Sequence, residues 1–214
     1  MTRAEVVKQM SDVGLVPVIR AKSADALADI ARALMAGGVP IAEVTMTVPG
    51  AIGGIRHLVK TFGKDLLVGV GSVTNVEQAE EAIDAGAQFV VSPVLVPAVI
   101  KVAQKHDTAV VPGAFTPTEI FTAYDLGSDV VKVYPSDLGG PGYIKALLAP
   151  MPFLKLMATG GVNLTTVGAF LKAGAVTLGA GAALVDARAI EQGDWAKLTD
   201  LARQFRDKVK EARA

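Results

Sequence analysis

The sequence predicts an α/β protein of the (β/α)8, or TIM barrel, class, with one helix before the barrel and another after it. Two observations lead to this prediction. Short β-branched apolar runs alternate with amphipathic segments along all 214 residues, and eight such units follow one another at intervals of roughly 20–25 residues. Continuous apolar runs are typical of parallel strands buried on both faces. A doubly wound open sheet is the competing architecture, but it usually ends after five or six strands.

The predicted strands are short runs rich in β-branched residues. In order they cover residues 15–19, 41–45, 66–70, 89–91, 109–111, 130–134, 154–158 and 175–178. Residues 2–13 carry charges at helical spacing, so we expect a helix there that caps the bottom of the barrel. The closing helix over residues 195–209 places its apolar residues on one face: Trp195, Leu198, Ala202, Phe205 and Val209.

The helices between the strands have recognisable start and stop signals. Side chains that can cap a helix N-terminus stand at Ser23, Asn75, Thr116 and Asn163. Glycines after the last apolar residue predict left-handed caps at Gly37, Gly86, Gly127 and Gly174. Because no linker or low-complexity segment separates the units, we predict a single domain over residues 1–214.

The composition excludes several classes of protein. Apolar residues make up 51% and charged residues 20% of the chain, which does not fit a disordered or fibrous protein. Lys and Arg together number 21, and so do Asp and Glu, which makes the net charge zero. The charge therefore does not indicate nucleic acid or an anionic membrane as a partner. The chain has no Cys, and its first residues lack the apolar run of a signal peptide. We therefore expect a soluble, cytoplasmic protein.

Catalytic groups of such barrels lie at the C-terminal ends of the strands. Lys132 stands out there, since it interrupts an apolar strand and shares a face with Val130 and Tyr134. A buried lysine with no acidic neighbour in sequence is expected to have a pKa below the usual ~10.4. It would then be a nucleophilic amine suited to Schiff-base chemistry. A lysine that extends from the strand end into solvent, or a plain ion pair, is the alternative interpretation.

Two further polar residues end predicted strands. Glu43 shares a face with Thr45, and its carboxylate could move protons at a carbinolamine or beside a carbonyl. Arg20 ends the first strand, where a guanidinium suits bidentate binding of a carboxylate or phosphate. A structural alternative stays open, in which Glu43 forms a salt bridge with Arg20 or Lys132.

Two glycine-rich loops follow the last two strands, at residues 159–163 and 179–182. Loops at these places often bind phosphate, because backbone N–H groups and a helix N-terminus converge on the anion. Tight turns also use glycine, so Gly161 alone would be a weak signal. A third glycine-rich stretch, residues 139–143, is interpreted as a flexible loop at the mouth.

The sequence lacks the residue patterns that several other kinds of catalytic site require. His57 and His106 are the only histidines, and they have neither the spacing of a metal site nor a place in a Ser–His–Asp triad. No P-loop or dinucleotide-binding glycine motif follows the first strand. Lysine chemistry without a metal is the interpretation that remains, so we predict no metal site and no cofactor.

Eight segments at the predicted strand ends carry a family resemblance. They are VPVIR (16–20), AGG…AEVTMTVPGA (36–51), VGVGSVTNVEQ (68–78), AGAQFVVSP (85–93), PGAFTPTE (112–119), VKVYPSDLGGPGYIKAL (131–147), ATGGVNLTTV (158–167) and LGAGAALV (178–185). In this order the sequence resembles the 2-keto-3-deoxy-6-phosphogluconate (KDPG) / 4-hydroxy-2-oxoglutarate (KHG) aldolase family of class I pyruvate aldolases. The resemblance covers nearly the whole chain.

The resemblance implies a role for each matched residue. Lys132 would be the Schiff-base lysine that attacks the pyruvyl ketone, Glu43 the general acid/base, and Arg20 the group that holds the pyruvate carboxylate. Pro93, Pro112 and Tyr134 would line the pyruvyl pocket, and Gly160, Gly161, Gly181 and Ala182 would surround the distal phosphate. Thr45, Ser72 and Thr159 are also expected to bind the substrate. The resemblance also implies a homotrimer and a reversible cleavage to pyruvate and glyceraldehyde 3-phosphate, with a phosphorylated 2-keto acid as the small-molecule partner.

Two positions depart from the family pattern on the phosphate side. The pattern EVTLRTP has Thr47 here in place of its Arg, and Ala182 stands where Ser is frequent. Loss of one charge-assisted contact, typically ~1.5–3 kcal/mol, would weaken phosphate binding unless Ser136, Thr159 or Lys145 compensates. The stretch 135–147 is closer to the branch specific for 6-phosphogalactonate.

Several substrates and activities therefore stay open at this point. KHG, the galactonate epimer and an unphosphorylated 2-keto-3-deoxy acid would keep the same chemistry. A sugar-phosphate isomerase or epimerase barrel that uses Glu43 as a base is a more distant alternative, and a non-catalytic sugar-acid binding protein is a third.

Overall fold

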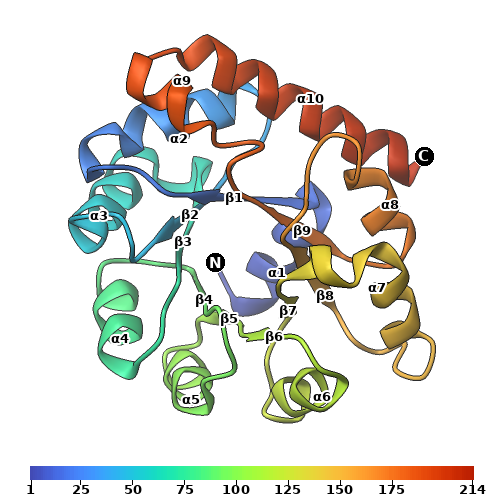
Figure 1. Cartoon of the computed structure of the whole chain (residues 1–214). Coiled ribbons are helices and arrows are strands. Elements are labelled where there is room, and N and C mark those ends of the chain that lie inside the picture. Colours follow the sequence, from blue (N-terminus) through green and yellow to red (C-terminus); the bar gives the residue numbers. More distant parts are fainter.

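The computed structural model describes residues 1–214, and it shows a parallel β-barrel inside a ring of helices (Figure 1). The strands neighbour one another in the order β5-β4-β3-β2-β1-β9-β8-β7-β6. Their bounds are β1 Leu15–Ile19, β2 Ile41–Thr45, β3 Leu67–Gly71, β4 Phe89–Val91, β5 Ala109–Val111, β6 Gly113–Ala114, β7 Val131–Val133, β8 Leu156–Thr159 and β9 Thr177–Ala180. The predicted fold class, a (β/α)8 barrel with a helix at each end of the chain, is confirmed.

The structure has nine strands because the extended segment 109–114, which begins with the fifth predicted strand, is divided at Pro112. Proline has no N–H to donate to a ladder, so it interrupts strand pairing. The half before it pairs with β4, where Phe89 faces Ala109, and the half after it pairs with β7, where Gly113 faces Lys132. One extended segment therefore contacts both neighbours and completes the barrel.

The chain also contains ten α-helices and three short 3-10 helices; α1 precedes the first strand, and α9 and α10 follow the last. Their bounds are α1 Arg3–Val13, η1 Ala24–Ala26, α2 Leu27–Ala36, α3 Ala51–Phe62, η2 Gly63–Asp65, α4 Val76–Asp84, α5 Pro97–Lys105, α6 Pro117–Asp125, η3 Ser136–Leu138, α7 Gly140–Leu148, α8 Val167–Lys172, α9 Ala187–Gln192 and α10 Trp195–Arg213. None of them combines the length and the apolarity needed to cross a membrane.

Most of the predicted helix signals act as expected. Asn75 caps α4 by accepting a hydrogen bond from the backbone of Gln78, and Thr116 forms a capping box with Glu119 at the start of α6. Asn163 does not begin a helix, because its side chain instead closes a turn by accepting from the backbone of Thr165, and α8 begins four residues later.

The left-handed cap predicted at Gly37 is wrong. Gly37 has a φ of −77°, and the positive φ falls on Gly38 at +86°. Gly37 is required by packing instead, since a Cβ added there would lie 2.4 Å from the Cβ of Ala202 on α10. Gly86, Gly127 and Gly174 do adopt positive φ values, as predicted.

Apolar side chains form one core inside the barrel and a larger one between barrel and helices. Helix α1 belongs to the inner core, because Val6, Val7 and Met10 pack with residues near the beginning of the strands, such as Val16 and Ile41. It therefore closes the barrel at the end opposite the mouth, as predicted. On α10 the face predicted from the sequence is buried in the outer core, with Trp195 partly buried at its start.

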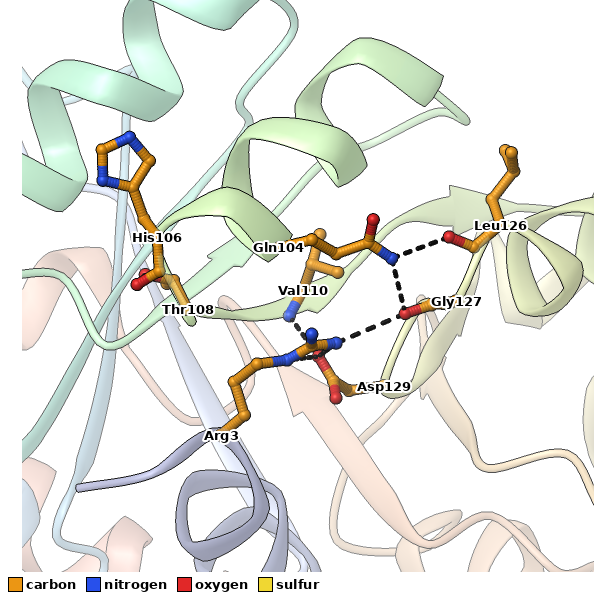
Figure 2. Close-up of polar contacts among 8 residues, drawn as sticks. All are labelled: Arg3, Gln104, His106, Thr108, Val110, Leu126, Gly127 and Asp129. Atoms are coloured by element: carbon orange, nitrogen blue, oxygen red, sulfur yellow. Dashed lines mark hydrogen bonds and ion pairs between the residues drawn. The ribbon is translucent and has the colours of Figure 1, made fainter.

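A polar junction at the closed end ties α1 to the α6–β7 connection (Figure 2). The Asp129 carboxylate accepts from the Arg3 guanidinium at 2.9 Å and from the Val110 backbone N–H at 2.9 Å. The Gln104 amide donates to the backbone carbonyls of Leu126 and Gly127 at 2.8 and 3.1 Å. These contacts join segments that lie far apart in the sequence.

Candidate active site

The C-terminal ends of β2 and β7 bring a buried acid and a buried amine into one electrostatic environment. Glu43 is fully buried and Lys132 is 5% exposed, although both are charged residue types. The Glu43 carboxylate and the Lys132 amine influence each other's pKa, and Arg20 influences both. The three residues singled out from the sequence therefore belong to a single site.

Burial favours the uncharged form of the Lys132 amine. Removal from water lowers its pKa below the ordinary value, the Arg20 cation lowers it further, and the Glu43 carboxylate acts against them. The alternative of a lysine that reaches into solvent is wrong, because so little of the residue is exposed. The Lys132 Nζ lies 5.1 Å from the centre of the Tyr134 ring, which places that ring beside the amine.

The Glu43 carboxylate has the opposite shift. Burial raises its pKa, and the nearby cations of Lys132 and Arg20 reduce that rise. Neither carboxylate oxygen has a hydrogen-bond partner. No ion pair of the structure includes Glu43, Lys132 or Arg20, so the direct salt-bridge alternative is wrong. An unpaired, buried carboxyl beside an amine is suited to accept and donate protons.

Arg20 begins the loop after β1 and is exposed at the mouth. Its Nη1 lies 3.1 Å from the place that a Cβ on Gly181 would occupy, next to the glycine-rich loop after β9. A guanidinium between the buried pair and this loop can bind an anionic group at the open side of the site.

The two threonines that follow Glu43 form a hydrogen-bonded chain. Thr45 is buried, and its hydroxyl donates to the Ile19 carbonyl at 2.9 Å. The Thr45 and Thr47 hydroxyl oxygens lie 2.6 Å apart. Because the Thr45 proton is already used, Thr47 is the donor in this pair. Thr45 thus joins β1 to β2, and Thr47 keeps only acceptor capacity.

On the opposite side of the mouth, Ser136 joins the ends of β7 and β8. Its buried hydroxyl donates to the Val133 carbonyl at 2.7 Å and accepts from the Thr159 N–H at 3.0 Å. Thr159 itself is 7% exposed, and its hydroxyl has no partner. Ser136 is therefore engaged in the framework, whereas Thr159 has an available hydroxyl.

The remaining predicted residues surround this centre. Gly160 and Gly161 adopt φ values of +102° and +67° and lie against the side chain of Asp137. Ser72 follows β3 with a φ of +59°, which is uncommon for a residue with a side chain. Pro93 is partly buried, Pro112 is buried, and Ala182 is exposed.

A cavity of about 620 Å³ lies beside the mouth, and sequence reasoning did not anticipate most of its lining. Arg20 and Thr47 line it together with Lys22, Ser23 and Glu191, while Lys132 and Glu43 do not. Lys22 and Glu191 form an ion pair of 2.8 Å between exposed side chains. The sequence could have indicated Lys22 as a cavity residue, because it lies only two residues from Arg20 in the loop after β1. No group of His, Asp and Glu side chains is arranged to hold a metal ion.

Comparison with known proteins identifies this arrangement. The family model for KDPG and KHG aldolase matches residues 6–201. The chain belongs to the KDPG and KHG aldolase family. The family recognised from the sequence segments is therefore confirmed.

Individual members of the KDPG and KHG aldolase family match nearly the whole chain. The 2-dehydro-3-deoxy-phosphogluconate aldolase of Treponema pallidum is 34% identical over 203 residues, which are 93% of this chain and 95% of that protein. The structure of KDPG aldolase from Legionella pneumophila, with pyruvate captured as a covalent carbinolamine intermediate, is 29% identical with a TM-score of 0.87 over 95% of this chain and 97% of that chain.

A third match is a cube-shaped protein cage designed by fusing symmetric oligomeric domains. It is 29% identical to this chain, with a TM-score of 0.86, and the match covers 94% of this chain and 73% of that chain.

Proposed function

We propose that this protein is a class I aldolase that reversibly cleaves a 2-keto-3-deoxy-6-phospho sugar acid of the KDPG type to pyruvate and glyceraldehyde 3-phosphate. The observation that carries the proposal is the buried Lys132 amine, whose pKa burial lowers. An amine without its proton is the nucleophile that imine formation needs. The names of the relatives, and the covalent pyruvate adduct in the Legionella protein, support the same chemistry.

The proposed reaction begins when the Lys132 nitrogen attacks the C2 ketone. The resulting carbinolamine loses water to form an iminium. The C4 hydroxyl then gives up its proton, the C3–C4 bond breaks, and its electron pair moves toward the iminium nitrogen to leave an enamine. Protonation of the enamine at C3 and hydrolysis release pyruvate and restore the amine.

Glu43 is the proposed carrier of the protons in these steps. Its pKa is raised by burial, so the carboxyl can hold a proton under conditions where an exposed glutamate would have lost it. Arg20 is the proposed partner of the substrate carboxylate, because a cation at the mouth can orient that group by charge-assisted hydrogen bonds. No metal is required by this sequence of steps.

The alternative substrates differ from the KDPG type at the aldehyde end or at C4. They are KHG, the galactonate epimer and an unphosphorylated acid, and all of them keep the same chemistry. Thr47 and Ala182 supply no positive charge at the places where the resemblance predicts phosphate contacts. Release of pyruvate from each of the four substrates, measured with the purified protein, would rank them.

Borohydride trapping with pyruvate tests the imine itself. Reduction of the imine fixes a pyruvate-derived mass on the protein, and we expect peptide mapping to place it on Lys132. Lys132→Ala should lose both the adduct and the cleavage activity. Active, folded wild-type protein without an adduct would contradict the aldolase and favour an isomerase that uses Glu43 alone. An adduct on Lys145 would retain the chemistry and reassign the nucleophile.

We further propose that the protein is a homotrimer. An aromatic cluster of Phe121, Tyr124 and Phe153 supports an interface, since each side chain is 42–49% exposed and the rings contact one another. The match to a cage designed by fusing symmetric oligomeric domains also supports an oligomeric state. A single domain over residues 1–214 and a cytoplasmic location stay predictions.

A further inference from the structure

The Glu43 carboxylate occupies the space that a side chain at Gly71 would need. Gly71 ends β3 with an ordinary negative φ, so the backbone conformation does not require glycine. A Cβ on Gly71 would lie 2.0 Å from Oε1, 2.7 Å from Cδ and 2.8 Å from Cγ of Glu43. Any side chain at this position would therefore displace the carboxylate or the strand.

No protein group donates a hydrogen bond to the carboxylate in that place. Both of its oxygens are buried, and both lack a partner. Packing and the nearby cations of Lys132 and Arg20 are the protein features that act on it. Glycine in a strand destabilises that strand. The space that Gly71 provides for the carboxylate is a functional reason for a glycine at this position.

The same relation occurs on the other side of the mouth. A Cβ on Gly179 of β9 would lie 2.3 Å from the Thr159 hydroxyl oxygen, which also lacks a partner. Thr159 and Gly179 face each other in the register of β8 and β9. Each of these two buried polar groups without a partner thus lies against a glycine of the neighbouring strand.

We propose that Gly71 is a positioning residue, whose missing side chain leaves the space that holds the Glu43 carboxylate next to Lys132. The consequence for catalysis rests on the proposed function, since it needs Glu43 to move protons. The steric relation does not depend on the reaction. Gly71 touches no reacting atom and acts only through Glu43.

A stability cycle tests the steric relation without any substrate. Glu43→Asp removes one methylene and withdraws the carboxylate from the place that a Cβ would occupy. We expect Gly71→Ala to lower the Tm of the wild-type protein by about 5 °C. In the Glu43→Asp background, the same substitution should lower Tm by no more than half as much. Additive effects of the two changes would overturn the proposal. If Gly71→Ala does not fold, recovery of folded protein in the double variant supports it and continued failure overturns it.

Gly69→Ala is the matched control. Gly69 lies two residues earlier on β3, and a Cβ there would meet the Phe89 ring at 2.4 Å instead of Glu43. We expect this variant to lose stability as well, but Glu43→Asp should not restore it. Equal rescue at both positions would mean that the Asp substitution stabilises the barrel for an unrelated reason.

The catalytic consequence is read from the pH profile of pyruvate release. Gly71→Ala should lower kcat by at least about tenfold and move the inflection assigned to Glu43, while Gly69→Ala should keep the wild-type inflections. A Gly71→Ala enzyme with a wild-type profile and kcat within about twofold would overturn the positioning role. Absence of imine in the wild-type protein would instead refute the proposed function, and the stability cycle would still decide the steric relation.

Discussion

At the level of single residues, burial of Lys132 and Glu43 controls when the amine is reactive. Burial lowers the lysine pKa below its ordinary 10.5, and the Glu43 carboxylate partly reverses this shift. A group with a lowered pKa loses its proton at a lower pH, so imine formation should increase with pH and level off below 10.5.

The effect of the Glu43 charge on Lys132 predicts the direction of change in a Glu43→Gln variant. The substitution removes the carboxylate that raises the lysine pKa, so the inflection for imine formation should move to lower pH. The rate of borohydride trapping with pyruvate, followed as a function of pH, measures it independently of carbon–carbon cleavage. An inflection that moves to higher pH would show that Glu43 does not act on the amine by charge.

Thr47 provides a second prediction at the residue level. It lines the cavity that also contains Arg20, and its hydroxyl carries no charge. Thr47→Arg would add a charge-assisted contact, typically ~1.5–3 kcal/mol, which corresponds to a lower KM by about tenfold or more for a phosphorylated substrate. KM for the unphosphorylated analogue should change little. Equal changes for both substrates would place Thr47 away from the phosphate.

At the level of helices and strands, the junction around Asp129 connects the N-terminal helix to the barrel. The carboxylate accepts from Arg3 and from the Val110 N–H, and the Asp129 side chain is only 16% exposed. Asp129→Ala leaves both donors without this partner, so we expect a loss of about 2–3 kcal/mol in the free energy of unfolding. Chemical denaturation measures it.

Asp12→Ala is the control for this junction. Asp12 lies on α1, as Arg3 does, and pairs with Lys8. Its side chain is 60% exposed, and exposed ion pairs contribute about 0–1 kcal/mol to the free energy of unfolding. Pyruvate trapping by folded protein should be unchanged in both variants, because the junction lies at the closed end of the barrel. Similar losses in the two variants would contradict a special role for Asp129.

At the level of the whole molecule, the proposed trimer should depend on the aromatic cluster. Tyr124 lies between the other two members, with ring centres 6.4 Å from Phe121 and 4.8 Å from Phe153. Phe121→Asp places a charge where an apolar contact is expected, so light scattering should give the mass of a monomer. Phe121→Leu keeps the apolar character and should remain trimeric. A trimeric Phe121→Asp protein would show that the interface lies elsewhere.

The sequence by itself determined the fold class and the family, and it indicated the residues of the proposed site. Strand and helix patterns depend on near neighbours in the chain, so the alternation of β-branched apolar runs with amphipathic segments predicted the barrel. Lys132 was recognisable because a charged residue inside an apolar strand is unusual. The exact residue at which a helix ends depends on packing as well as on local sequence, so the positive φ at the end of α2 falls on Gly38 and not on Gly37.

Only the tertiary structure decided how the site residues act on one another. β2, β3 and β7 bring Glu43, Gly71 and Lys132 together from distant parts of the chain, and no local pattern contains their mutual distances. The same applies to Ser136, whose hydroxyl joins two strands and has no proton left to donate to a ligand. Burial and electrostatic influence arise from packing across the barrel, so they are properties of the closed sheet and not of any one strand.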